Sequence, residues 1–238
     1  MFKVVIVIPV YKRPEIWEIC ANNLNNFILN ETANKYSVIC ILSDDDPEFT
    51  RNRAICEKNN YTYCLHPNYP VSDKQNAGII LAAESFDYDY IMHLGSDNFI
   101  HPRLMDIYRP FMEKQTAFFG IHRLYFYNYE TEQTILFTSV SGNGAIGPGR
   151  MIHKSVLEEF KDDGFRVYPS GLNCNMDGGS AKRITEKGFE EMILDVDEFP
   201  YIVDIKTTDN ITQFEYLAEM SELYVNSEKS VLTNLFVL

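Results

Sequence analysis

Residues able to bind a nucleotide and a cation occur at several separate places in the sequence. Asp97 and the run 44–46 supply carboxylates, Arg13 and Lys74 supply positive charge, and Tyr11 supplies an aromatic ring. Carboxylate oxygens are ligands for Mg²⁺ or Mn²⁺, cationic side chains neutralise phosphates, and aromatic rings stack on planar bases. These residues can serve one site only if the fold brings them together.

The first half of the chain alternates predicted strands with predicted helices. Residues 3–8 are a continuous apolar, β-branched run, which is typical of a strand buried on both faces of a parallel sheet. Residues 15–29 then carry apolar side chains at helical spacing. Further strands are predicted at 37–42, 61–65 and 88–94, with helices at 48–58 and 73–86 between them. This order predicts an α/β fold with a mostly parallel, doubly wound sheet.

The candidate residues lie directly after these predicted strands. In open α/β sheets ligands bind at the carboxyl ends of the strands. The loops after the first, second and last of these strands contain Pro9, Tyr11 and Arg13, then the acidic run 44–46, then Gly95, Ser96 and Asp97. We therefore expect these loops to meet at one edge of the sheet.

The second half of the chain has a mixed pattern. Strands are predicted at 116–122, 124–127, 135–140, 192–196 and 201–205, with helices near 154–160 and 177–187 and a helical tail. We expect one domain over residues 1–238, in which residues 1–115 bind a nucleotide and residues 116–238 complete the site. The two halves are expected to share one sheet.

In order and spacing, several segments resemble family 2 glycosyltransferases, which have the GT-A fold. Segments 4–13, 42–46, 74–78 and 89–97 resemble the family's opening strand-to-loop motif, base-binding acidic loop, basic-Asn-x-Gly helix and metal-binding D-x-D strand end. The stretches that begin at Gly144 and at Met176 resemble, more weakly, the acceptor-side loop and the E-D motif that carries the catalytic base. The resemblance covers roughly residues 2–205, and it implies that residues 1–115 are the nucleotide-sugar-binding half and residues 116–238 the acceptor-side half.

The resemblance implies a metal-dependent, inverting transfer of sugar from a nucleotide diphosphate, with a UDP-sugar favoured, to an acceptor hydroxyl. Asp97 is expected to hold Mn²⁺ or Mg²⁺, and Asp177 to take the proton of the acceptor. The residues expected to bind the nucleotide sugar are Pro9, Tyr11, Arg13, Asp44, Lys74, Asn76, Ser96 and Asp97.

Two positions depart from the family pattern. Gly95 stands where the D-x-D motif has its first carboxylate, and Met176 stands where the family often has Glu. A protein that binds nucleotide sugars without catalysis is therefore an alternative. A nucleotidyltransferase is another, although the first loop lacks the glycines that a triphosphate needs.

Each candidate residue also has a structural alternative. Asp97 and Asp177 could cap helices, because Asp is a common N-cap residue. Lys74 could be a surface lysine, and the run 44–46 a solvated turn. His93 lies inside a predicted buried strand and is expected to be a core residue with its hydrogen bonds satisfied.

Composition limits the classes of partner. The 21 basic and 34 acidic residues give a net charge of −13, which disfavours general nucleic-acid binding and favours a small-molecule or carbohydrate partner. The five cysteines are odd in number and widely spaced, so neither a disulfide framework nor a thiolate zinc site is expected. Without an apolar run of about 20 residues, no stable membrane insertion is expected, and we predict a cytoplasmic protein. The acceptor (carbohydrate, protein or modified nucleobase) and the oligomeric state stay open.

Overall fold

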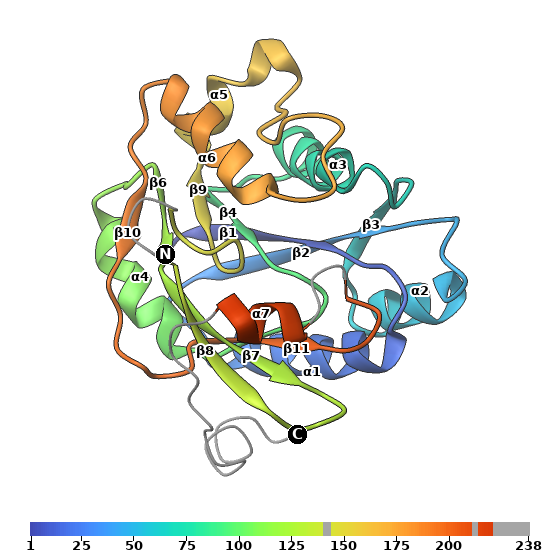
Figure 1. Cartoon of the computed structure of the whole chain (residues 1–238). Coiled ribbons are helices and arrows are strands. Elements are labelled where there is room, and N and C mark those ends of the chain that lie inside the picture. Colours follow the sequence, from blue (N-terminus) through green and yellow to red (C-terminus); the bar gives the residue numbers. More distant parts are fainter. Residues whose placement is uncertain (140–143, 211–213, 221–238) are drawn as a thin grey trace.

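The strands of the protein form two sheets in a computed structural model that describes residues 1–139, 144–210 and 214–220 (Figure 1). The larger sheet has seven strands in the order β10-β6-β9-β4-β1-β2-β3. Their bounds are β1 (Lys3–Pro9), β2 (Lys35–Leu42), β3 (Thr62–Leu65), β4 (Tyr90–His93), β6 (Phe118–Ile121), β9 (Met151–His153) and β10 (Met192–Leu194).

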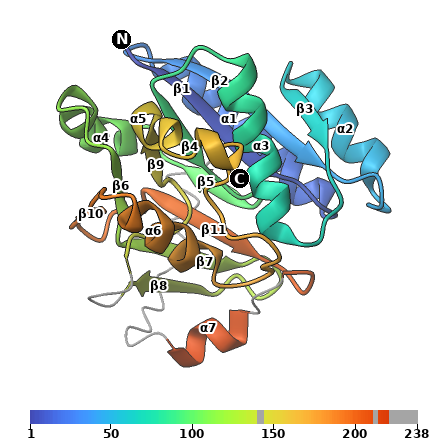
Figure 2. The same ribbon diagram turned by 90° about the horizontal axis from the view of Figure 1, so that it is seen from above.

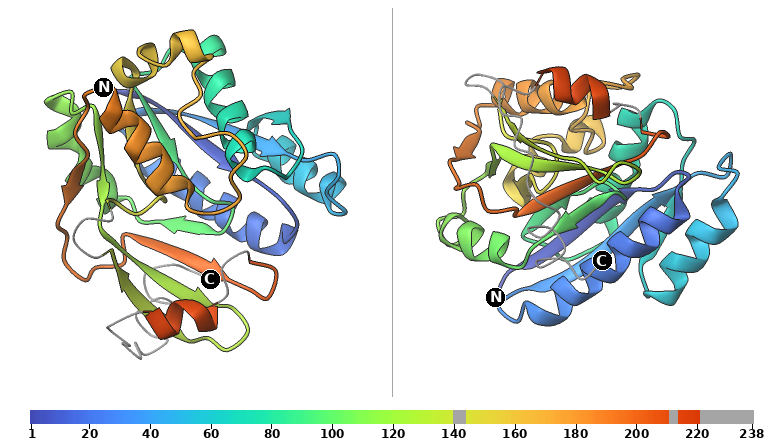
Figure 3. Two further views of the ribbon diagram at one scale, coloured as in Figure 1. Left: turned by 45° about the horizontal axis from the view of Figure 1, so that its top comes forward. Right: turned by 60° about the horizontal axis from the view of Figure 1, so that its bottom comes forward.

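Helices cover both faces of the larger sheet, as Figure 3 shows from two sides. One face packs against α1 (Pro14–Asn30), α2 (Phe49–Lys58) and α4 (Arg103–Glu113), and the other against α3 (Val71–Ser85), α5 (Lys154–Glu158) and α6 (Met176–Glu186). A short 3₁₀ helix (Lys161–Asp163) follows α5.

The apolar run of β1 is explained by this double cover. Val4, Ile6 and Ile8 face the core on the α1 side, whereas Val5 and Val7 face the core on the α3 side. Successive side chains of a strand point to opposite faces, so a strand between two helical layers has to be apolar throughout.

The parallel part of the sheet aligns the ends of its strands. β1 pairs in parallel with both β2 and β4, and β2 pairs in parallel with β3. β9 is antiparallel to its two neighbours, β4 and β6, so the sheet is mixed at that point. The loops after β1, β2 and β4 therefore leave the sheet at the same edge.

The second sheet has the order β5-β11-β7-β8 and lies beside the first, with α7 (Phe214–Met220) next to it (Figure 2). Its strands are β5 (Asn98–Ile100), β7 (Arg123–Asn128), β8 (Thr134–Thr138) and β11 (Ile202–Lys206). The strands predicted at 124–127 and 135–140 form the antiparallel β7–β8 pair, although residue 140 lies outside the described part.

The expectation that both halves share one sheet is wrong in part. β6, β9 and β10 extend the larger sheet, but β7, β8 and β11 form the second sheet together with β5 from the first half, and β11 is the strand that pairs with β5. Sequence patterning did not predict β5 or β9, because each has only three residues and shows no measurable alternation. In the described part, no helix has the length and apolar character needed to cross a membrane.

Candidate functional site

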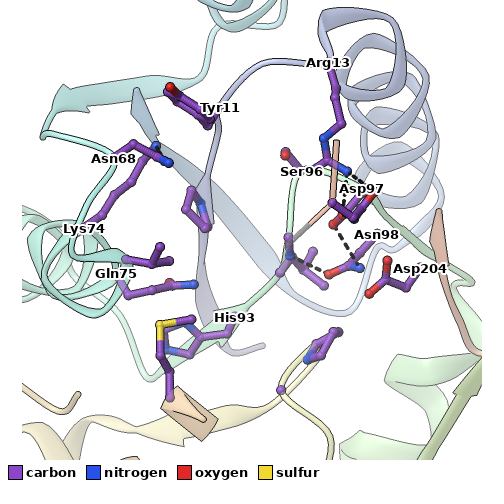
Figure 4. A pocket seen from close by; sticks show the side chains of 18 of the residues that line it. Tyr11, Arg13, Asn68, Lys74, Gln75, His93, Ser96, Asp97, Asn98 and Asp204 are labelled. Atoms are coloured by element: carbon purple, nitrogen blue, oxygen red, sulfur yellow. Dashed lines mark hydrogen bonds and ion pairs between the residues drawn. The ribbon is translucent and has the colours of Figure 1, made fainter. Parts of the chain in front are cut away.

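A cavity of about 310 Å³ opens where the loops after β1 and β4 meet the second sheet (Figure 4). Most of the residues predicted to form the site line this cavity, namely Pro9, Tyr11, Arg13, Lys74, Ser96, Asp97 and Asp177. Asp44 and Asn76 are not among its lining residues. The sequence therefore located the cavity, but the role of each side chain depends on its contacts.

Asp97 belongs to a hydrogen-bonded triangle with Arg13 and Asn210. Arg13 Nη1 donates to Asp97 Oδ2 at 3.0 Å and to Asn210 Oδ1 at 2.8 Å. Asn210 Nδ2 donates to Asp97 Oδ2 at 2.9 Å. Burial acts to raise the pKa of Asp97, but the charges of Arg13 and Lys206 outweigh it and hold this pKa below its ordinary value. Asp97 is therefore ionised and held in place.

The backbone that carries Arg13 adopts a conformation that is rare for residues other than glycine. Lys12 and Arg13 have φ values of 55° and 46°. Asp46 Oδ2 accepts from the Lys12 backbone N–H at 2.9 Å, and Asn52 Nδ2 donates to the Lys12 carbonyl at 3.2 Å. Asn52 Nδ2 also donates to Asp46 Oδ2 at 2.9 Å. Asp46 is thus buried in the support of the Arg13 loop, whereas Asp44 is exposed on the turn.

Lys74 is buried, so the alternative of a surface lysine is wrong. Its Nζ donates to the Val10 carbonyl at 2.7 Å, to Ser43 Oγ at 2.7 Å and to Asn68 Oδ1 at 3.0 Å. Burial lowers the pKa of Lys74 to about 8. An ammonium group has three N–H bonds, and all three are used to join the loops that follow β1, β2 and β3.

Asn76 likewise makes its contacts within the protein. Its Nδ2 donates to the Tyr168 carbonyl at 2.9 Å, and its Oδ1 accepts from the Tyr168 N–H at 3.0 Å. This pair of bonds holds the segment before α6 against α3. The intervening residue of the helix, Gln75, lines the cavity.

Asp177 lies in the first turn of α6, and the N-cap of that helix is Asn175. The alternative that Asp177 is the cap is therefore wrong. A Cβ on Gly147 would come within 2.3 Å of Asp177 Oδ2, so the carboxylate lies directly against this glycine. The residue is open to solvent, yet the protein around its carboxylate removes enough water to raise the pKa of Asp177, with Arg150 acting against this shift. A carboxylate with a raised pKa is suited to accept a proton.

Arg150 fixes the start of α6 by a hydrogen bond to the backbone of Asp177. It is 1% exposed, and its Nη1 donates to the Asp177 carbonyl at 2.9 Å. Its Nη2 lies 3.1 Å from Glu191 Oε1. This buried cation therefore links the loop before β9 to the residue that precedes β10 and to α6.

β11 and the segment after it contribute four side chains that sequence reasoning missed, namely Asp204, Lys206, Asp209 and Asn210. Lys206 Nζ lies 3.0 Å from the Asp204 carboxylate. Burial and the nearby charge of Asp97 raise the pKa of Asp204 above its ordinary value. Asp204 is opposite Asn98 in the β5–β11 pair, and no local pattern in the sequence could have indicated that pairing.

A site for Mn²⁺ or Mg²⁺ would have to rest on one carboxylate, that of Asp97. Asp97 Oδ2 accepts the bonds described above, whereas Oδ1 is 3.5 Å from Asn98 Nδ2. A Cβ on Gly95 would lie 2.4 Å from Asp97 Oδ1, so the first D-x-D carboxylate has no room unless Asp97 moves. Across the described residues no cluster of three or more His, Cys, Asp or Glu side chains is suited to a metal ion. These ions keep several waters and bind substrate phosphates, so Asp97 Oδ1 is compatible with such a site.

Solved structures with the same fold are glycosyltransferases. The fragment 1–349 of S. aureus TarS matches with a TM-score of 0.57 and 12% identity, over 85% of this chain and 60% of that one. The mannosyltransferase PcManGT from Pyrobaculum calidifontis, in complex with GDP-Man and Mn2+, matches with a TM-score of 0.58 and 12% identity, over 91% and 59%. The UDP-GlcNAc complex of the TarS fragment matches with a TM-score of 0.53 and 12% identity, over 98% and 71%.

These matches confirm the expected GT-A fold. Because identities are near 12%, they are evidence for the fold alone, and the chain spans about 60% of the length of the first two structures. No model of a known protein family matches the sequence, and no curated protein does either.

Proposed function

We propose that the protein is a glycosyltransferase that moves a sugar from a nucleotide diphosphate, with a UDP-sugar as the favoured donor, to an acceptor hydroxyl with inversion. One observation carries the proposal: a single cavity is lined both by the charged group around Asp97 and by the Asp177 carboxylate, whose pKa is raised. Inverting transfer needs those two chemistries, a charged site for the diphosphate and a base for the acceptor.

The diphosphate is assigned to the side of the cavity that holds Arg13, Lys206 and Asp97. Two cations, Arg13 and Lys206, balance two carboxylates, Asp97 and Asp204. A diphosphate adds negative charge to this group, so further positive charge beside it would favour binding. Mn²⁺ or Mg²⁺, held by Asp97, would supply that charge and stabilise the departing diphosphate. Tyr11, on the wall of the same cavity, is the candidate for stacking on the base.

Asp177 is assigned as the general base. As the acceptor oxygen bonds to the anomeric carbon, the bond from that carbon to the diphosphate oxygen breaks, and the hydroxyl proton passes to Asp177. Attack on the face opposite the diphosphate inverts the anomeric centre. A positioned base contributes about 10²–10⁴ in rate.

The test measures binding and bond cleavage separately. Thermal unfolding with Mn²⁺ and each of UDP, CDP and GDP reports binding, and we expect UDP to raise the melting temperature most. Release of free UDP from UDP-glucose and UDP-N-acetylglucosamine reports cleavage, with water as the acceptor. Asp177→Asn is the matched control, since it should bind UDP normally but cleave the bond between sugar and diphosphate more slowly.

Each result has a separate meaning. If no nucleotide diphosphate changes the melting temperature, the protein is not a nucleotide-sugar enzyme. If donors bind but neither protein releases UDP, the alternative of a binding protein without catalysis is correct. If wild type and Asp177→Asn release UDP at the same rate, Asp177 is not the general base.

A further inference from the structure

Two uncharged polar side chains that line the cavity have buried atoms with no hydrogen-bond partner among the described residues. His93, at the end of β4, is 3% exposed, and both of its ring nitrogens lack a partner. Gln75, on α3, has a buried Oε1 that also lacks one. The expectation that His93 is a satisfied core residue is therefore wrong. Buried polar atoms are nearly always paired, so two unpaired groups on one cavity call for an explanation.

The surroundings of His93 keep its ring in one orientation. The backbone of His93 is hydrogen-bonded to the segment just before β9, since its N–H donates to the Arg150 carbonyl at 3.1 Å and its carbonyl accepts from the Gly149 N–H at 2.7 Å. The ring contacts Tyr168 edge to face, with centroids 5.3 Å apart and planes at 86°. Tyr168 is itself held by Asn76. The ring therefore cannot easily turn toward another partner within the protein.

The chemistry of this pair suits a neutral ligand that carries hydroxyl groups. Burial, with Arg150 nearby, lowers the pKa of His93 to about 3, so the ring is neutral and offers one donor and one acceptor. Gln75 Oε1 is an acceptor and needs a donor. An anionic phosphate has no proton to give to these acceptors, whereas a sugar hydroxyl both donates and accepts.

The position of the pair agrees with that ligand. In Figure 4 Gln75 and His93 lie on the opposite side of the cavity from Arg13 and Asp97. Asp177 and Gly147 line the same cavity. A donor whose diphosphate lies at Arg13 can therefore extend its sugar toward His93 and Gln75.

Resting on the proposed function, we infer that His93 and Gln75 form the subsite that binds the hydroxyl groups of the transferred sugar and sets which sugar is accepted. His93 exchanges hydrogen bonds with the sugar through its ring nitrogens, and Gln75 Oε1 accepts one. The nucleotide and diphosphate make no contact with either residue. A site built around such bonds discriminates against sugars that cannot form them.

The test compares the affinity for a nucleotide with that for its sugar conjugate. Dissociation constants of UDP, UDP-glucose, UDP-N-acetylglucosamine, GDP and GDP-mannose are measured by calorimetry with Mn²⁺. His93→Phe keeps a ring against Tyr168, and Gln75→Met keeps the length of the side chain. His66→Phe is the matched control, because His66 lies outside the cavity.

We expect each cavity variant to bind the preferred sugar nucleotide about tenfold more weakly, while its affinity for the free nucleotide stays within twofold. His66→Phe should change neither value. Equal weakening of nucleotide and conjugate would mean that the residues support the fold of the site, and unchanged affinity for the conjugate would mean that they do not contact the sugar. Either result overturns the inference and leaves the proposed function standing.

A second measurement does not depend on how the variants fold. In wild-type protein with ¹⁵N-labelled histidine, the ring nitrogens of His93 should shift when the preferred sugar nucleotide is added, and should not when the free nucleotide is added. Identical spectra with both ligands would refute the contact. If the wild type binds none of the five probes, the proposed function fails, and this inference fails with it.

Discussion

Replacement of Gly147 by alanine should slow sugar transfer about 10²-fold without weakening nucleotide binding. A Cβ at this position would lie 2.3 Å from Asp177 Oδ2 and 2.6 Å from Asp177 Cγ. Ordinary contact between these atoms needs about 3.5 Å, so the carboxylate has to move by about 1 Å. Because the moving atoms end a side chain, the cost to folding is small. A displacement of about 1 Å in a catalytic group can reduce the rate about 10²-fold.

The assay is release of UDP from the donor at saturating concentration, together with the dissociation constant for UDP. Gly147→Ala should lower kcat about 10²-fold and leave the UDP affinity within twofold. Gly95→Ala is the matched comparison, since its Cβ would lie 2.4 Å from Asp97 Oδ1. That variant should instead weaken UDP binding in the presence of Mn²⁺.

Two outcomes would refute this reasoning. If Gly147→Ala keeps wild-type kcat, the position of the Asp177 carboxylate does not limit the reaction. If Gly147→Ala and Gly95→Ala weaken UDP binding alike, the diphosphate site and the general base do not lie in separate parts of the cavity.

Four further predictions follow from the same contacts. Asp177→Asn should bind UDP within a few-fold of wild type and transfer sugar about 10² more slowly, which single-turnover assays would show. Asp97→Ala should remove the Mn²⁺-dependent stabilisation by UDP, about 2.7 kcal/mol at a hundredfold excess of ligand over Kd; an equal melting shift in both proteins would contradict it. Asp46→Ala removes the carboxylate that accepts from the Lys12 N–H, so the left-handed Lys12–Arg13 backbone should lose its support and UDP binding at Arg13 should weaken. Unchanged UDP affinity would show that the loop keeps its conformation without this hydrogen bond. Because burial lowers the pKa of His93 to about 3, the folded protein holds this ring neutral while the unfolded chain protonates it below about pH 6.5. The free energy of unfolding should therefore be unaffected by His93 above about pH 6.5, fall by about 2 kcal/mol at pH 5, and fall further toward pH 3. Urea unfolding of wild type and His93→Phe at pH 5 and pH 7 checks this, and equal pH dependence would contradict it.

The sequence by itself determined the alternating architecture and the edge where the site lies. The run of β1 is apolar on both faces because helices cover both, and such a run can be recognised without coordinates. Asp97 and Arg13 follow strand ends, and parallel pairing of β1 with β4 brings those ends together. Asp177 was found through its resemblance to a motif, and its place on the cavity agrees with the role proposed for it.

Only the tertiary structure showed whether each polar side chain bonds to neighbouring loops or faces the cavity. Lys74 and Asn76 are in a helix whose pattern matches a nucleotide-binding motif, yet their hydrogen bonds go to neighbouring loops. His93 has the sequence environment of a core residue, and only the geometry leaves its ring unpaired at the cavity. Asp204 lies close enough to feel the charge of Asp97 because two short strands, β5 and β11, pair although they are far apart in the sequence. Periodicity and strand-end rules depend on neighbours along the chain, whereas these contacts depend on packing between distant elements, which no local pattern encodes.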